Sequence, residues 1–170
     1  MNKFKFCFLI MMLFITSSLF ALEGAFFGLG GDANGNTREG VAAGSVLTIG
    51  LDINRYFSLG FKKTYSFDFK DMTTIEDAGF IRFYPLEKIR IFLQAELGTS
   101  VLNEDNKSLP VLLGAFATGA RFPLGSYFYL EPHVRGGYPF IWSAGLMAGA
   151  SFSGDFRGDE KTQRTQRKEE

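Results

Sequence analysis

The stretch Ile-Arg-Ile-Phe-Leu-Gln-Ala-Glu-Leu-Gly, at Ile89–Gly98, decides the fold. Its odd-numbered residues are all apolar, whereas Arg90, Gln94 and Glu96 stand at even positions. Because successive side chains of a β-strand point to opposite faces, this stretch predicts a strand with one apolar and one ionic face. The segment Tyr127–Arg135 alternates in the same way. Two such strands indicate a closed sheet with a polar interior.

The N-terminal residues predict a secretory signal peptide. Lys3 and Lys5 precede the apolar run Phe6–Ile15, which is shorter than the roughly 20 residues of a membrane-spanning helix. Cleavage is expected after Ala21, with cleavage after Ser18 and an uncleaved anchor helix as alternatives. The chain is therefore divided into a signal peptide (1–21), a barrel (22–152) and a polar, disordered, periplasmic tail (153–170).

Composition narrows the class of protein. The 170 residues include 20 Phe and 20 Gly, too many for a helical bundle, and 18 Lys plus Arg balance 18 Asp plus Glu. The absence of a basic run before the tail and of a recognition motif argues against a nucleic-acid partner. Cys7 lies in the leader, so the mature chain has no cysteine for a disulfide or a metal site.

Beyond the leader, short alternating segments are the only elements of the sequence that can cross a membrane. Eight are predicted: Gly24–Gly31, Gly40–Ile53, Tyr56–Phe67, Ile75–Tyr84, Ile89–Gly98, Pro110–Phe122, Tyr127–Arg135 and Phe140–Phe152. We predict an all-β fold, an eight-stranded antiparallel up-and-down transmembrane β-barrel with apolar residues outward and polar residues inward. A soluble sandwich with the same alternation is the alternative.

The connections alternate between tight turns and longer polar loops, as in outer-membrane barrels. The loops Asp32–Glu39, Asp68–Thr74 and Thr99–Leu109 are expected at the cell surface, where a host or other surface ligand would bind. Aromatic residues gather at both rims: Tyr56, Phe57, Phe83, Tyr84, Phe122, Tyr127 and Phe128 at the inner, and Tyr65, Phe67, Tyr138, Phe140 and Trp142 at the outer. Lys63 breaks the outward apolar pattern, so it either extends toward a head group or marks a bulge.

The inward positions carry a network of polar side chains in a lumen that eight strands leave only wide enough for side chains to fill. Its predicted members are Asp52, Lys62, Glu76, Arg82, Arg90, Gln94, Glu96, Arg121, Glu131, His133 and Arg135. Because an unpaired ion in so narrow a space is costly, mutual pairing that plugs the barrel is the main interpretation. A path for small anions along the arginines is the alternative. Inward glycines either make local room or let bulky neighbours pack.

No catalytic or metal-binding constellation is present in the sequence. His133 has Glu131 and Arg135 as its neighbours of the same parity and no serine, so a satisfied interior histidine is favoured over a catalytic base. One histidine and scattered carboxylates make no metal-ligand cluster. Gly28–Gly31 lacks the lysine and the strand-to-helix context of a phosphate-binding loop. We expect no enzyme activity and no cofactor.

Three segments carry a resemblance to a known group of proteins: Gly79–Leu86, Ile91–Gly98 and Ser143–Phe152. Through them the chain resembles the small eight-stranded outer-membrane barrels, the families of outer-membrane protein W and of the outer-membrane protein A transmembrane domain. The last strand, ending at Phe152, is similar to the terminal signal of the barrel-assembly machinery, although a polar tail follows. The charged interior departs from the apolar lumen of the protein W family and is closer to the protein A type.

The function expected from these features is that of a bacterial outer-membrane barrel with a charged, largely plugged lumen and a structural or surface-interaction role. A small porin-like channel is the second interpretation and a lipid-modifying enzyme the third, with a secreted soluble lipid-binding barrel as the non-membrane alternative. A monomer surrounded by outer-membrane lipid is expected.

Overall fold

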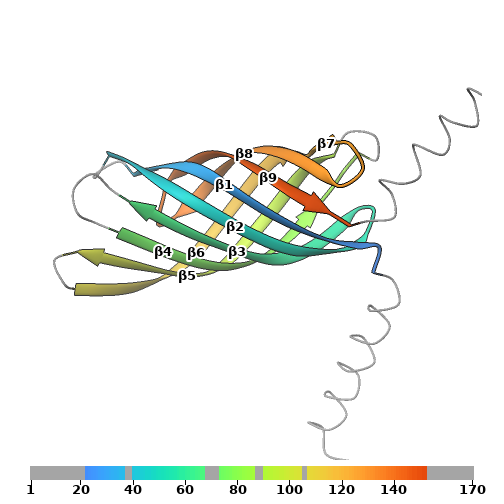
Figure 1. Cartoon of the computed structure of the whole chain (residues 1–170). Coiled ribbons are helices and arrows are strands. Elements are labelled where there is room, and N and C mark those ends of the chain that lie inside the picture. Colours follow the sequence, from blue (N-terminus) through green and yellow to red (C-terminus); the bar gives the residue numbers. More distant parts are fainter. Residues whose placement is uncertain (1–21, 37–39, 68–72, 87–89, 105–106, 153–170) are drawn as a thin grey trace, which may run out of the picture.

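The protein is built from an antiparallel β-sheet that closes on itself (Figure 1). The computed structural model describes residues 22–36, 40–67, 73–86, 90–104 and 107–152. The predicted signal peptide and tail lie outside these residues. The strands are β1 (Gly24–Asn36), β2 (Gly40–Asn54), β3 (Phe57–Phe67), β4 (Thr73–Phe83), β5 (Ile91–Glu104), β6 (Lys107–Ala120), β7 (Phe122–Leu124), β8 (Phe128–Tyr138) and β9 (Trp142–Ser151).

The nine segments form eight barrel strands, because β7 continues β6 beyond a break at Arg121. Both β6 and β7 pair with β8, and the backbone N–H of Arg121 donates to the carbonyl of Arg90 at 2.9 Å. Each strand otherwise pairs with its neighbour in sequence, and β1 pairs with β9 to close the sheet. The predicted eight-stranded antiparallel barrel is confirmed.

Residues that pair across neighbouring strands form rows around the barrel, and each row shifts along the barrel axis as it passes from strand to strand. A row that starts at Phe128 in β8 runs through β9, β1, β2, β3, β4, β5 and β6. It returns to β8 at Tyr138, ten residues after its start. Such a stagger requires strands tilted by roughly 35–45°, and the tilt is plain in Figure 1. We call the end near Phe128 the tight-turn end and the end near Tyr138 the loop end.

Side chains alternate between the interior and the outer surface along the strands. In β2, Val46 and Thr48 are 2% and 1% exposed, whereas Leu47 and Ile49 are 41% and 51% exposed. The exposed large side chains of the other long strands are mostly apolar too. An outer surface of this kind suits the hydrocarbon of a bilayer, and the pairing of β1 with β9 removes the free edges of these two strands. Among the described residues, no helix is long and apolar enough to cross a membrane.

Five strands, β1, β4, β5, β6 and β8, extend further toward the loop end than the sequence suggested. The predicted loop Asp32–Glu39 is wrong for Asp32–Asn36, which belongs to β1. Thr73 and Thr74 belong to β4, and most of Thr99–Leu109 lies in β5 and β6. Asp32, Asn34 and Thr74 at these strand ends are buried, although polar residues of this kind are also typical of loops. The remaining loop residues, 37–39, 68–72 and 105–106, lie outside the described residues.

Aromatic side chains line both rims, with two exceptions. Phe57 and Phe83 pack with ring centroids 5.1 Å apart at the tight-turn end. Tyr84 and Phe140, predicted to face outward, are instead 1% and 5% exposed. Tyr84 shares the inward parity of Arg82, and Phe140 lies in the short connection between β8 and β9. At Tyr84 period two therefore overrides the tendency of aromatic residues to collect at the membrane interface.

A charge placed midway along the outer face is expected to destabilise the barrel. Leu29 is 58% exposed and its row neighbours in β2 and β9 are Leu47 and Ala148. Replacing Leu29 by arginine should cost about 2–4 kcal/mol of unfolding free energy in vesicles, because the ion then lies in hydrocarbon. The matched change Val41→Arg, near the loop end, should cost about 0–1 kcal/mol. Equal costs in urea titrations would contradict a lipid-facing surface.

Candidate functional site

The barrel interior holds nearly balanced charges. Among the described residues, four buried cations face five buried carboxylates, with His133 between them. The cations are Lys62, Arg82, Arg121 and Arg135, and the carboxylates are Asp32, Asp52, Glu76, Glu96 and Glu131. Most of them fall into two groups of contacts, which we name after their central residues.

The Glu131 cluster lies in the half of the lumen near the tight-turn end and joins β4, β8 and the break between β6 and β7. Glu131 accepts two hydrogen bonds from Arg82, each of 2.8 Å, in a bidentate pair. It also accepts one from Arg121 Nε at 2.9 Å. Arg82 Nε in turn donates to Gln94 Oε1 at 2.8 Å. One carboxylate therefore pairs with two guanidinium groups whose side chains are 1% and 0% exposed.

Aromatic rings cover the faces of these two guanidinium groups. Arg82 Cζ lies 3.9 Å from the ring centroid of Phe92. Arg121 Cζ lies 4.2 Å from the rings of both Phe26 and Tyr129. The two terminal nitrogens of Arg121 have no hydrogen-bond partner among the described atoms. The electron-rich ring faces provide part of the stabilisation that a second carboxylate would otherwise supply.

The Lys62 cluster lies nearer the loop end and connects β1, β3, β4, β5 and β8. Lys62 Nζ is 3.7 Å from Asp32 Oδ2 and 3.5 Å from Glu96 Oε1. Arg135 pairs with Glu96 at 2.9 Å and with Glu76 at 3.0 Å. The side chains of all five are at most 5% exposed. The cluster therefore links strands from opposite sides of the barrel.

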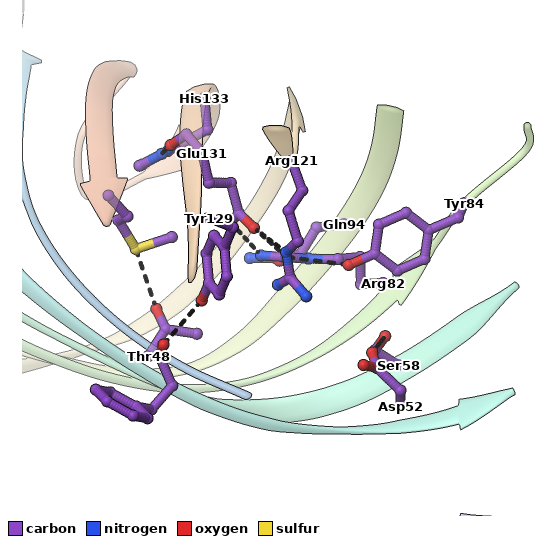
Figure 2. A network of polar contacts seen from close by, with 12 residues as sticks. Thr48, Asp52, Ser58, Arg82, Tyr84, Gln94, Arg121, Tyr129, Glu131 and His133 are labelled. Atoms are coloured by element: carbon purple, nitrogen blue, oxygen red, sulfur yellow. Dashed lines mark hydrogen bonds and ion pairs between the residues drawn. The ribbon is translucent and has the colours of Figure 1, made fainter. Parts of the chain in front are cut away.

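The side-chain amide of Gln94 connects the two clusters. Gln94 accepts from Arg82 and donates to Glu96 Oε1 at 2.7 Å. Figure 2 shows Arg82, Arg121 and Glu131 converging inside the barrel, with the Asp52–Ser58 pair apart from them. That pair, whose O···O distance is 2.5 Å, joins β2 to β3. Polar contacts thus run along much of the lumen.

The structure places ten of the eleven predicted network residues in the buried interior. Arg90 is the exception: it lies half-buried ahead of β5, with its guanidinium 5.0 Å from the ring of Tyr84. Sequence reasoning missed Asp32, which was assigned to a loop, and Tyr84, which was assigned to the aromatic girdle of the inner rim. The period-two alternation of the first strand, carried one residue beyond Gly31, would have placed Asp32 inside, and the shared parity of Arg82 and Tyr84 would have placed Tyr84 inside.

The inward glycines let bulky side chains pack against the wall. A Cβ at Gly50 would overlap the ring of Phe26, and one at Gly60 would lie 2.6 Å from the ring of Phe80. Gly149 lies in the same way against Tyr129. Of the two interpretations left open by the sequence, the structure supports packing at these positions, and the rings that pack there also cover the guanidinium groups.

His133 is held by polar neighbours on both ring nitrogens. Its Nε2 is 3.0 Å from Asp32 Oδ1 and its Nδ1 is 3.4 Å from the backbone oxygen of Glu131. Within the described part of the chain, no group of three or more His, Cys, Asp or Glu side chains is arranged to hold a metal ion. The histidine thus contacts the Lys62 cluster through Asp32.

Comparison with known proteins identifies the fold but no family. No family model matches the sequence. No curated protein matches it either. Among solved structures, the N-terminal β-barrel domain of Pseudomonas aeruginosa OprF is similar, with a TM-score of 0.60 and 14% identity over 77% of this chain and 98% of that chain.

Two further barrels have similar scores. Pseudomonas aeruginosa OprG, an outer membrane protein, gives a TM-score of 0.55 and 9% identity over 78% of this chain and 97% of that chain. Yersinia pestis outer membrane protein Ail gives a TM-score of 0.54 and 13% identity over 76% of this chain and 99% of that chain. The chain therefore has the fold of the small eight-stranded outer-membrane β-barrels, and the resemblance drawn from the sequence is confirmed for the fold.

Proposed function

We propose that the protein is an outer-membrane barrel whose lumen is closed by its own ion pairs and which serves a structural or surface-interaction role. The observation that carries this proposal is the Lys62 cluster, which joins five strands across the lumen with side chains at most 5% exposed. A water-filled path needs polar groups that face solvent, whereas these groups face one another. The similar fold of known outer-membrane barrels supports the location.

The surface role is supported by two hairpins at the loop end. The β1–β2 pairing continues to Asn36 opposite Gly40, and the β5–β6 pairing continues to Glu104 opposite Lys107. Strands paired to their last residues make stiff supports for the segments that join them. We propose that these tips meet a surface ligand, that membrane lipid surrounds the barrel, and that a cleaved signal peptide and the barrel-assembly machinery deliver a monomer to the membrane.

A closed lumen predicts that the wild-type barrel conducts no steady ionic current. The mature chain is folded into vesicles, its insertion is verified by the shift in gel mobility between boiled and unboiled samples, and the vesicles are fused with a planar bilayer. We expect a silent bilayer, because crossing ions would have to displace buried pairs. Stable unitary currents from verified barrels would favour the porin-like alternative.

No described contact favours the enzyme alternative. The contacts of His133 are with a carboxylate and a backbone carbonyl, and neither is a nucleophile of the serine type.

A further inference from the structure

An ion pair on the outer face of the barrel stands apart from the interior clusters. Lys63 in β3 lies directly opposite Asp77 in β4. Lys63 Nζ donates to Asp77 Oδ1 at 2.9 Å and to Oδ2 at 3.2 Å. The two side chains are 49% and 40% exposed. The β3–β4 register is unbroken through this pair, so the bulge considered for Lys63 is absent and both residues face outward.

The pair lies just inside the aromatic rim of the loop end. Tyr65, the next outward residue of β3, packs edge-on against Phe67 with ring centroids 4.5 Å apart. Toward the tight-turn end, the next outward residue is Phe61, 41% exposed. Aromatic belts lie at the level of the lipid head groups, and lysine side chains near that level extend toward it. Lys63 is therefore placed where hydrocarbon meets head groups.

The climb of the rows sets the depth of the two charges. Each row of paired residues shifts toward the loop end as it passes from β3 to β4. The backbone of Asp77 consequently lies nearer that end than the backbone of Lys63. In a phosphoethanolamine lipid of that leaflet, the phosphate lies nearer the acyl chains and the ammonium lies further out. The order of opposite charges on the lipid matches the order of the basic and the acidic residue along the barrel.

A gap in the side chains lies beside the pair on the hydrocarbon side. Gly79, the next outward position of β4, has Phe61 and Leu97 as its row neighbours. A Cβ at Gly79 would approach no atom beyond its chain neighbours closer than 3.9 Å, and Leu97 is 66% exposed. An acyl chain fits over this open position with a bulky side chain on each side. The gap lies below Asp77, where such a chain would descend from the head group.

We propose that Lys63, Asp77 and Gly79 form a binding site for one phospholipid with a phosphoethanolamine head group. Lys63 donates to the phosphate, the lipid ammonium donates to Asp77, and one acyl chain lies over Gly79. A purely anionic head group meets the Asp77 carboxylate, and a quaternary ammonium has no N–H to donate to it. A second copy of the chain would have to bury both charges away from water, which is costly.

The test is lipid retention by the full mature chain, folded in micelles and analysed by native mass spectrometry. The probes are phosphatidylethanolamine, phosphatidylglycerol and phosphatidylcholine with identical acyl chains in equal amounts. We expect preferential retention of phosphatidylethanolamine, and a loss of about tenfold in Lys63→Met and in Asp77→Asn, because each variant removes a charge-assisted hydrogen bond. The double variant Lys63→Asp with Asp77→Lys keeps an ion pair but places the acidic residue deeper than the basic one. It too should lose the preference for phosphatidylethanolamine.

Gly79→Leu fills the gap and should lower retention of all three lipids. The matched control is Gly114→Leu. Gly114 is an outward glycine midway along β6, and no heavy atom lies within 4 Å of the position its Cβ would take. Unboiled gel mobility establishes that each variant is folded. Unchanged retention in Lys63→Met and Asp77→Asn, a preference for phosphatidylglycerol, equal effects at Gly79 and Gly114, or a dimer that these variants dissociate would each overturn the proposal.

Discussion

Replacing Glu131 with glutamine is expected to lower the unfolding free energy of the barrel by about 3–5 kcal/mol. The amide preserves the shape of the side chain but removes the negative charge that pairs with Arg82 and Arg121. Both guanidinium groups would remain buried, at 1% and 0% side-chain exposure, without the carboxylate that pairs with them. The measurement is urea unfolding from vesicles, followed by the fluorescence of Trp142, the single tryptophan.

Two controls separate the loss of this pair from a general effect of charge. Glu23→Gln removes an exposed carboxylate beside β1 and should change the unfolding free energy by no more than about 0.5 kcal/mol. Replacing Arg82, Arg121 and Glu131 together by methionine removes all three ions and should recover much of the loss, because no ion of this cluster is left without its partner. A change of less than about 1 kcal/mol in Glu131→Gln would show that the cluster is not held as described.

Arg135→Met is expected to weaken the barrel by about 3–5 kcal/mol and to open the lumen to cations. Arg135 is the cation that contacts both Glu76 and Glu96, at 3.0 and 2.9 Å. Without it, Lys62 remains to balance several carboxylates. Uncompensated negative charge draws in water and cations. Planar-bilayer recordings should then show cation-selective currents that are absent from the wild type.

The compensated variant Arg135→Met with Glu76→Gln tests the cause of the opening. It restores the charge balance of the Lys62 cluster while keeping the shorter side chain at position 135. If unpaired charge opens the lumen, the currents should fall back toward the wild-type level. If the smaller side chain at position 135 opens it, the currents should persist. Anion-selective currents in Arg135→Met, or a stability equal to that of the wild type, would contradict the arrangement of ion pairs.

The fold was predictable because one physical rule dominates it. Lys62 and Lys63 are adjacent in sequence, yet period two places the first inside and the second outside, where the structure finds them. The rule failed where composition was allowed to outweigh it. Asp32 was assigned to a loop because glycine and asparagine surround it, and Tyr84 was assigned to the rim because it is aromatic.

The pairing of charges across the lumen could not be predicted from the sequence. The alternation of polar and apolar residues tells which face of the sheet a residue occupies but not its position along the barrel axis. That position depends on the stagger between strands. The ten-residue climb brings Glu131 to the level of Arg82, which lies 49 positions away in sequence. Nothing local to either residue encodes that distance, because the stagger is a property of the closed sheet.

The seam between β1 and β9 ties barrel closure to charge neutralisation. It places Phe26 opposite Ser151 and Gly35 opposite Trp142, joining segments from the two ends of the described chain. An unclosed sheet in lipid would expose two edges of unpaired amide and carbonyl groups. It would also separate Asp32 in β1 from His133 in β8, which contact each other across β9. Entry into the membrane, completion of the sheet and assembly of the Lys62 cluster must therefore occur as one cooperative event, in which a partly inserted chain gains little until its last strand arrives.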